Sequence, residues 1–301
     1  MSYRNFEELF QHRITKKSAF AVVCAEDPNV LKMSEMALGA GIGEPLLIGD
    51  SEKIKQMIST IPDLLESEIC HAASLDDAVA MAIRFVRDGR VKALVKGHID
   101  TASLMKGIVN KESGLRTGAL MSHLTLLEMD SYHKLIGLTD GALIPFPDFE
   151  KKKEILKNAV SFFRSIGCAK PKVAVLAPVE SVTEKFPETL DAAKLETAAR
   201  EGQFGDCIVE GPISYDLAMR SGATSLKEYE SQIAGEVDLF LVPYLTVGNV
   251  LLKALTCSAG ARGAGVVLGA EVPVVLTSRS SSADTKFRSL ALAMSSSPMS
   301  F

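Results

Sequence analysis

Hydrophobic residues along the chain gather in short runs of strand length, and the stretches between them repeat apolar residues every three or four positions. The runs occupy residues 19–24, 45–48, 91–95, 124–129, 135–138, 173–177, 238–242, 266–268 and 272–277. This alternation is typical of helices packed on a largely parallel sheet. The pattern therefore predicts an α/β fold.

The stretch at residues 74–87 shows the helical repeat most clearly. Ser74 suits the N-cap, and Asp77 stands at the third position of a capping box. Gly89 then ends the predicted helix before the strand at 91–95.

Two prolines and a charged run at residues 143–153 interrupt this rhythm. Such a segment is typical of a crossover between domains, so we place a boundary near Pro147. A last helix from Ala283 to about Ser295 predicts a return of the chain to the first domain. We expect an α/β domain I at residues 1–146 plus 279–301 and an α/β domain II at residues 147–278.

The length of 301 residues, with 47% hydrophobic side chains, is enough for one large or two medium domains with a substantial core. The formal net charge is −4, and lysine and arginine form no block. This charge gives no electrostatic reason to bind nucleic acid or a membrane surface. We therefore expect a small-molecule partner.

The five cysteines are odd in number and have no Cys-x-x-Cys spacing, which indicates a reducing compartment. The first residues lack an apolar signal core, and no apolar run approaches the length of a membrane span. The sequence predicts a cytoplasmic protein.

Ser278 and Arg279 follow a run of strand residues, just before Ser282 opens the last helix. In an open α/β sheet the strand carboxyl ends and the helix amino ends face the same side. These two side chains and free backbone N–H groups would therefore converge on an anion. The stretch predicts a site for phosphate or a similar oxyanion.

A second cluster, with Lys96, Thr101 and Lys106, follows another predicted strand. Gly97 frees the backbone there, and Thr101 is placed to cap the next helix. The three polar residues are candidates for holding phosphate. The alternative is an ordinary strand-to-helix turn with solvated lysines.

Arg116 lies between two glycines, and its guanidinium has the donor geometry that suits an oxyanion. His123 is a candidate acid/base group or metal ligand, although a histidine beside apolar residues is more often structural. The five histidines show no ligand spacing, so we expect no metal site.

Asp216 stands in the first turn of a predicted helix after Ser214, where the helix dipole lowers a carboxylate pKa. A structural role at the helix start and a catalytic role both remain open for Asp216. Gly248 and Asn249 begin another helix after a buried strand, with Lys253 one turn further on. Gly248 permits close approach of a ligand or a neighbouring strand, and Asn249 can orient a carbonyl or phosphate, while Lys253 is equally a surface lysine.

The order of these motifs resembles the phosphate acetyltransferase and phosphate butyryltransferase family, most closely its butyryltransferase branch. The most specific pieces are residues 210–216, 247–249 with 253–255, and 276–279. The likeness covers residues 96–111, 114–128, 132–140, 210–219, 238–255 and 259–292.

The resemblance implies a transferase that interconverts acyl-CoA and orthophosphate with acyl phosphate and free coenzyme A. Coenzyme A is then a substrate, and no further cofactor is expected. The resemblance also implies the two-domain fold of isocitrate and isopropylmalate dehydrogenases, with an interdomain cleft that holds Ser278 and Arg279. A homodimer, with domain II as the dimerisation domain, is part of the same expectation.

Two positions depart from the family pattern. The acetyltransferase branch has an aspartate base seven positions after the motif serine, where this chain has Thr285, and Asp284 is the nearest acid. A one-residue shift rotates a helical side chain by about 100°. Asp284 is our leading candidate base by proximity, with Asp216 behind it. Lys106 replaces an arginine, which keeps the charge but loses bidentate geometry.

In the mechanism we expect, a base generates the CoA thiolate, Arg279 binds the phosphoryl oxygens, and Ser278 stabilises the oxyanion, without an acyl-enzyme. A covalent route through Cys168, Cys207 or Cys257 is an alternative, although inert thiols are expected at these positions. A metal- and nicotinamide-dependent dehydrogenase is a second function class, with Asp100, Asp140 and His123 as scattered metal candidates. An inactive relative that binds acyl-CoA or phosphate is the third.

Overall fold

The computed structural model describes residues 2–14, 18–221, 229–278 and 281–297. The chain divides into two compact units, each built from separated segments. We call Leu9–Ala119 with Ala264–Met299 the N-terminal unit, and Met1–Glu8 with Leu120–Gly263 the central unit.

The N-terminal unit alternates strands and helices. Its elements are β1 (Ala19–Val23), α2 (Pro28–Gly39), β2 (Glu44–Gly49), α3 (Ser51–Ile58), η1 (Pro62–Leu64), β3 (Glu68–His71), α4 (Leu75–Arg87), β4 (Val91–Lys96), α5 (Thr101–Ile108), β11 (Val274–Val275) and α11 (Ala283–Ser295). Two further elements, α1 (Phe6–Arg13) and β10 (Arg262–Leu268), contain the unit boundaries.

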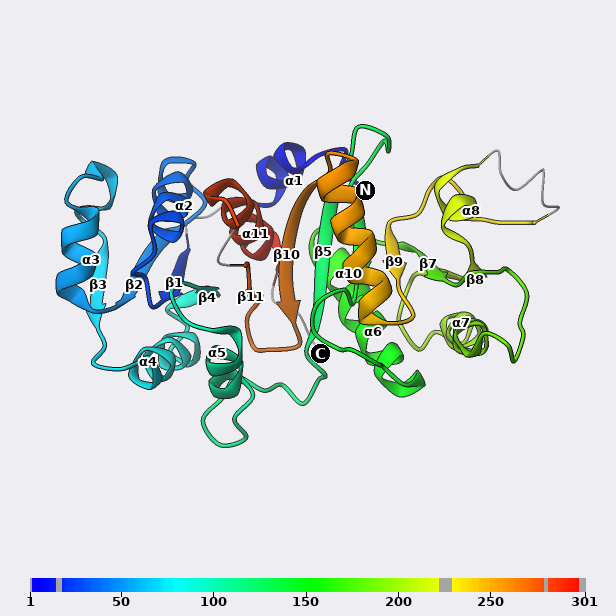
Figure 1. The fold of residues 1–301 in the computed structure, drawn as a ribbon, viewed down its shortest axis with the longest axis horizontal. Helices are drawn as coiled ribbons and strands as arrows, with labels where there is room; N and C mark the ends of the chain where they lie inside the picture. Colours follow the sequence, from blue (N-terminus) through cyan, green and yellow to red (C-terminus); the bar gives the residue numbers. More distant parts are fainter. Residues whose placement is uncertain (1, 15–17, 222–228, 279–280, 298–301) are drawn as a thin grey trace. The chain divides into compact units, whose positions relative to one another are not determined.

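Hydrogen-bonded strands of this unit follow the order β3-β2-β1-β4-β11-β10. The neighbours pair in parallel, except that β10 and β11 are antiparallel. In Figure 1, α2, α3 and α11 lie on one side of these strands and α4 and α5 on the other. Because helices cover both faces, β1 is almost wholly apolar and buried.

The central unit repeats the architecture with different connections. Its elements are β5 (Ser122–Glu128), β6 (Ile136–Thr139), α6 (Phe149–Ser165), β7 (Lys172–Leu176), α7 (Pro187–Arg200), β8 (Ile208–Ile213), α8 (Tyr215–Met219), β9 (Leu239–Leu241), α10 (Leu245–Lys253) and the π-helical turn η2 (Ala254–Ser258). The strands follow the order β5-β6-β9-β7-β8, with β5 and β6 antiparallel and the other pairs parallel. The prediction of a largely parallel α/β fold is confirmed.

Short polar side chains start many of the helices. Asp27, Asp50, Ser74, Asp100, Asp148 and Ser282 accept backbone N–H bonds as the N-caps of α2, α3, α4, α5, α6 and α11. The predicted start of α4 at Ser74 is therefore confirmed, since its hydroxyl accepts from the Asp77 N–H at 3.1 Å.

The hydrophobic runs do not predict two of the strands, β3 and β8, and each of these forms the edge of the order in its unit. An edge strand needs one partner only and carries more polar residues, so its hydrophobic signal is weak. Pro212 in β8 is tolerated for the same reason, because an edge strand need not donate every N–H.

The unit boundaries differ from the domain boundaries expected from the sequence, at 146/147 and 278/279. The compact units change at 119/120 and 263/264 instead. Strand β6 pairs with β9, and Asn158 of α6 donates to the Leu120 carbonyl at 2.6 Å, so residues 120–146 pack with later segments of the central unit. Strand β11 pairs with β4, which attaches residues near 274 to the N-terminal unit.

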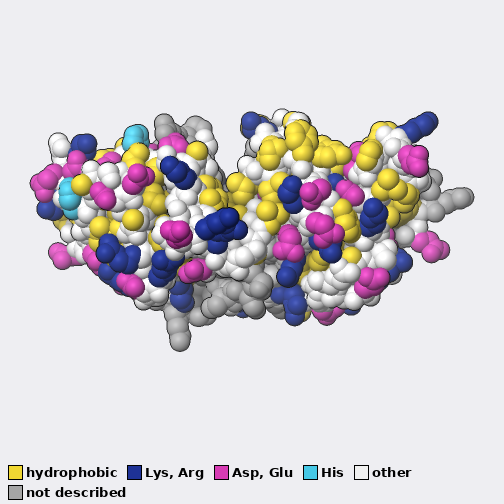
Figure 2. All heavy atoms as spheres, turned by 90° about the horizontal axis from the view of Figure 1, so that it is seen from below, with side chains coloured by type: hydrophobic (Ala, Val, Ile, Leu, Met, Phe, Trp, Pro, Cys, Tyr) yellow, Lys and Arg dark blue, Asp and Glu magenta, His cyan; other side chains and the backbone are white. Residues whose placement is uncertain are grey.

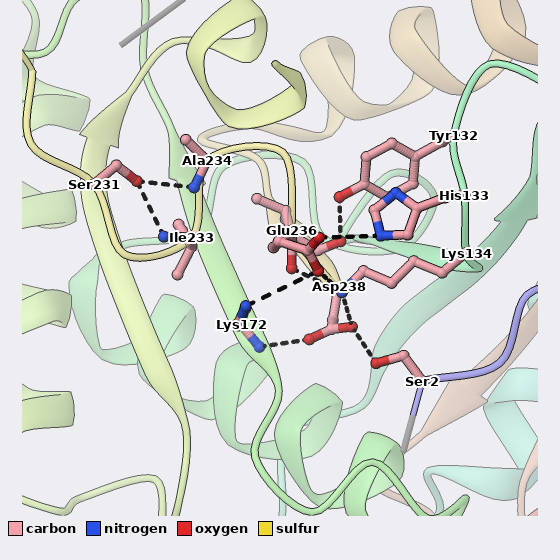
Figure 3. A network of polar contacts seen from close by, with 11 residues as sticks. Ser2, Tyr132, His133, Lys134, Lys172, Ser231, Ile233, Ala234, Glu236 and Asp238 are labelled. Carbon is pink, nitrogen blue, oxygen red and sulfur yellow. Dashed lines mark hydrogen bonds and ion pairs between the residues drawn. The ribbon is translucent and has the colours of Figure 1, made fainter. Parts of the chain in front are cut away.

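A buried polar network in the central unit centres on Asp238, at the start of β9 (Figure 3). Its carboxylate accepts from the Lys134 ammonium at 2.7 Å, the Ser2 hydroxyl at 2.9 Å and the Lys172 backbone N–H at 2.9 Å. These bonds join the N-terminal segment to β7 and to the segment before β6. A buried carboxylate with one cation and two further donors is well compensated.

We expect Asp238→Ala to lower the free energy of unfolding by about 3–5 kcal/mol, because the buried Lys134 ammonium loses its partner at 2.7 Å and keeps only the exposed Glu236 carboxylate at 3.6 Å. Urea denaturation measures the change. Asp206→Ala is the control, since it removes an exposed ion pair with Lys170 at 3.4 Å and should change stability little. Equal losses in the two variants would contradict this account of the network.

Candidate active site

The carboxyl ends of β1, β4 and β11 lie side by side in the N-terminal unit, because these strands are parallel neighbours. Lys96 is the last residue of β4, and its side chain is only 3% exposed. Its ammonium donates to the Ile99 carbonyl at 3.1 Å. The predicted strand-end lysine is thus present as a buried cation.

One expectation for the following turn is wrong. Thr101 does not cap α5; it is the exposed first helical residue, and Asp100 caps the helix by accepting from the Ser103 N–H at 2.8 Å. Asp100 takes this role because it directly precedes the helix. Gly97 serves packing: a Cβ there would meet the Cys24 carbonyl oxygen at 2.0 Å.

Lys106 is exposed on α5, beside a surface cavity of about 530 Å³ between α4 and α5. Arg84, Arg87 and Asp88 of the α4 side also line it. Arg87 is engaged locally, since it donates to the Gly114 carbonyl at 2.9 Å. Lys106 therefore faces a mixed-charge surface cavity.

Arg116 is also exposed, and its backbone forms a bridge with Ala270. Two hydrogen bonds fix this loop: the Thr117 hydroxyl donates to the Gly269 carbonyl at 2.9 Å, and the Glu271 N–H donates to the Leu115 carbonyl at 3.0 Å. The guanidinium is thus carried on an anchored loop.

Ser278 is exposed three residues beyond β11, while Thr277 beside it is buried. Arg279 lies outside the described residues. Helix α11 starts after Ser282, whose hydroxyl oxygen accepts from the Thr285 N–H at 3.3 Å. Asp284 is exposed in the first turn of α11. The predicted helix of residues 283–295 is confirmed.

The sequence interpretation missed Lys286, which is 2% exposed. Its ammonium donates to the Thr277 hydroxyl at 3.0 Å and to the Ser278 carbonyl at 3.1 Å. Burial lowers the pKa of Lys286, Asp27 opposes this, and the positive charge of Lys96 lowers the pKa further. A lysine in the first turns of an amphipathic helix is normally taken as solvated, so the local pattern carries no signal of this burial.

His123 in the central unit is coupled to Asp140 through the backbone. The His123 N–H donates to the Asp140 carboxylate at 2.8 Å, and the same carboxylate accepts from the N–H groups of Ala142 and Leu143 at 2.9 and 2.8 Å. Burial lowers the pKa of the His123 imidazole, against the opposing charge of Asp140. The neutral ring fits a structural role for His123.

Gly248 and Asn249 pack on this same segment. A Cβ at Gly248 would meet the Gly141 Cα at 2.8 Å, so the glycine permits close approach of the neighbouring segment. The Asn249 amide donates to the Gly141 carbonyl at 3.4 Å. Lys253 is exposed at the end of α10. His123, Gly248 and Asn249 therefore come together around residues 140–141.

Asp216 is exposed in the short helix α8, which Ser214 precedes. The Ser214 hydroxyl donates to Glu180 at 2.5 Å and makes no side-chain cap. Glu210 in this region accepts from the Ser231 hydroxyl at 2.5 Å and from the Gln232 N–H at 2.7 Å.

The cysteines differ in their surroundings. Burial raises the pKa of Cys168 and Cys207, which disfavours the nucleophilic thiolate. Cys257 is exposed, against the expectation of a buried thiol, because the π-helical turn η2 has no buried residue.

In the described ranges, no group of three or more His, Cys, Asp or Glu side chains is arranged to hold a metal ion. Asp100 caps α5, whereas Asp140 accepts backbone N–H groups in the central unit. On the face in Figure 2, acidic and basic side chains are interspersed. Every helix in the described part of the chain is too short or too polar to cross a membrane.

Comparison with known proteins agrees with the motif order. Residues 66–294 match the family model described as phosphate acetyl/butaryl transferase. The chain is 36% identical over 292 residues to the phosphate butyryltransferase of Clostridium acetobutylicum, covering 96% of this chain and 97% of the relative. It is 37% identical over 254 residues to the phosphate acetyltransferase of Rhizobium meliloti, covering 84% and 80%.

Solved structures show the same fold. A branched-chain phosphotransacylase from Enterococcus faecalis matches with a TM-score of 0.83 and 30% identity, covering 92% of this chain and 98% of that one. A putative 4-hydroxythreonine-4-phosphate dehydrogenase from Salmonella typhimurium matches with a TM-score of 0.57 and 16% identity, covering 93% and 99%. The second likeness concerns the fold alone and agrees with the expected dehydrogenase-like architecture.

The lowered pKa of His123 predicts a pH dependence of stability. Below the ordinary value of 6.5 the unfolded chain binds a proton that the folded imidazole resists, so this residue costs stability as the pH falls. We expect wild type to lose more stability than His123→Gln between about pH 7.5 and about pH 5.5, measured by urea denaturation. Parallel losses in the two proteins would contradict a lowered pKa of His123.

Proposed function

The chain belongs to the phosphate acetyl/butaryl transferase family, and we propose that it transfers butyryl or another short-chain acyl group by direct attack of the CoA thiolate in a ternary complex. As a member of this family it is a phosphate acyltransferase, which interconverts acyl-CoA and phosphate with acyl phosphate and CoA. The proposal concerns the acyl group, the mechanism and the residues.

The observation that best supports the proposed site is the arrangement of polar groups at the carboxyl ends of β4 and β11. Ser278 is exposed three residues beyond β11, and β11 is next in the sheet to β4, whose last residue is the buried Lys96. A hydroxyl donor beside buried cations suits a phosphoryl group and the oxyanion of a transferred acyl group. This supports a site built around Ser278, where the resemblance also assigns phosphate binding to Arg279.

The chemistry needs one bond to form and one to break. In the direction of acyl-CoA synthesis, the CoA sulfur bonds to the acyl carbon, and the bond from that carbon to the phosphate oxygen breaks. The thiol proton goes to a base, and inorganic phosphate leaves. Ser278 donates a hydrogen bond to the carbonyl oxygen as it gains negative charge. No acyl-enzyme forms, so no cysteine is required.

For the base we propose Asp284, with Asp216 as second candidate. The Asp284 carboxylate is exposed in the first turn of α11 and makes no hydrogen bond or ion pair with another residue in the part of the chain that the structure describes. It is therefore open to a substrate thiol. Asp216 is exposed as well, but it stands on α8 in the central unit.

The acyl group is proposed from the butyryltransferase likeness and from the related branched-chain phosphotransacylase. One methylene in an apolar pocket changes discrimination by about 1–3 kcal/mol, so neighbouring chain lengths remain substrates. We also propose that the chain forms a homodimer. Light scattering on the purified protein measures the mass, and a monomer at assay concentration would exclude it.

We expect the highest kcat/KM with butyryl-CoA in a panel of acetyl-, propionyl-, butyryl- and isobutyryl-CoA, each assayed with phosphate for CoA release. The apolar pocket should give a graded decline on either side of the preferred length. A maximum with acetyl-CoA would refute the butyryl proposal. CoA release that does not depend on phosphate would refute the transferase reaction itself.

We expect Ser278→Ala to lower kcat about 10²–10³-fold, as the loss of one oxyanion donor does. Asp284→Asn should lower kcat more than Asp216→Asn if Asp284 is the base. Ser59→Ala is the matched control, because Ser59 is an exposed serine of the same unit whose hydroxyl donates to the Gln56 carbonyl at 2.7 Å. Wild-type kcat in Ser278→Ala would remove Ser278 from the mechanism.

A further inference from the structure

Lys286 is one of the largest fully buried side chains among the described residues, although it carries a charge. Its ammonium group reaches from α11 to the irregular segment after β11. There it donates to the Thr277 hydroxyl at 3.0 Å and the Ser278 carbonyl at 3.1 Å. The side chain thus links the last helix to the strand end that carries Ser278.

Two other buried lysines show what a purely structural ammonium looks like in this protein. Lys134 pairs with Asp238 at 2.7 Å, and Lys152 pairs with Asp191 at 2.8 Å. Each has a carboxylate to offset the loss of hydration. The hydrogen-bond acceptors of Lys286 among the described residues are both uncharged oxygens.

The electrostatic surroundings of Lys286 are also unusual. The charge of Lys96 disfavours its ammonium form, and Asp27, the N-cap of α2, favours it. The two buried lysines thus repel each other, and the Asp27 carboxylate that favours the Lys286 ammonium is itself only half-buried. Such an arrangement costs stability, and costs of this kind concentrate at functional sites.

The position of the two acceptors explains how Lys286 would act. Strand β11 pairs with β4 only at Val274 and Val275, so Thr277 and Ser278 lie beyond the last paired residue. Without strand pairing, the Lys286 side chain holds Thr277 and Ser278, and the Ser281 N–H also donates to the Ser278 carbonyl at 3.1 Å. The bond to the Ser278 carbonyl restrains the same residue whose hydroxyl is proposed to act.

We propose that Lys286 is a positioning residue of the acyl-transfer site, whose ammonium orients Ser278 and adds positive potential for phosphate at the strand edge. The inference rests on the proposed role of Ser278. It assigns Lys286 no contact with the reacting atoms. Its effect on phosphate use passes through the segment at residues 277–278.

The test compares Lys286→Met, Lys286→Arg, Ser278→Ala and the double variant Lys286→Met/Ser278→Ala. Each is assayed for kcat and for KM of phosphate with butyryl-CoA. We expect Lys286→Met to raise the KM of phosphate about tenfold or more and to lower kcat, and Lys286→Arg to recover part of both losses. The double variant should be little worse than Ser278→Ala, because both changes disable one unit.

Thr277→Val is a second variant for the case in which Lys286→Met does not fold. It preserves the shape of the side chain and removes only the hydroxyl that accepts from Lys286. It should change the same constants in the same direction by a smaller factor. Lys152→Met is the matched control: this lysine is 3% exposed, and its loss should affect stability without moving the KM of phosphate. Thermal denaturation with and without inorganic phosphate gives a reading independent of turnover, and Lys286→Met should lose the stabilisation by phosphate.

The outcomes separate the two proposals. If Ser278→Ala is impaired while Lys286→Met and Thr277→Val keep wild-type constants, Lys286 has no positioning role and the proposed function stands. Full additivity in the double variant, or an unchanged phosphate-induced shift in Lys286→Met, also overturns the inference. If Ser278→Ala has wild-type kinetics, the proposed role of Ser278 fails and the inference fails with it.

Discussion

The pairing of β11 with β4 is the constraint on which the N-terminal unit and its candidate site depend. Val274 and Val275 align with Leu94 and Val95, which joins chain segments about 180 residues apart in the sequence. Since β1 is the parallel neighbour of β4 on its other side, three strand ends meet at one edge. This pairing brings Ser278 to the edge that also carries Lys96.

The short ladder has a consequence for how that edge is held. Two paired residues cannot by themselves fix the segment after them, and Pro273 before them has no N–H to donate. Helix α11 supplies the restraint that the ladder lacks, through the Lys286 ammonium and through the Ser289 hydroxyl, which accepts from the Gly265 N–H at 3.0 Å. Helix α11 is thus tied both to the segment that follows β11 and to β10, the neighbouring strand.

Local chemistry explains which features the sequence could predict. Apolar runs such as residues 19–24 and the cap at Ser74 depend on neighbours in the chain, so the sequence predicts them. The motif order that indicates the family is likewise a property of the sequence. The sequence does not predict the burial of Lys286, because that burial depends on packing between α11 and the ends of β4 and β11, which no local pattern encodes. The limits of the compact units are not predicted for the same reason. The pairing of β6 with β9, which is not local in the sequence, attaches residues 120–146 to the central unit.

The threonine at position 285 gains a physical meaning from this arrangement. Its N–H is held by the Ser282 cap, and its hydroxyl accepts from Arg288 at 3.3 Å, so the position serves the first turn of α11. The positive charges of Lys96 and Lys286 at the strand edge would stabilise a thiolate held nearby. A thiol that ionises more readily demands less of its base, and an exposed carboxylate such as Asp284 is then sufficient for the proton transfer in the proposed mechanism.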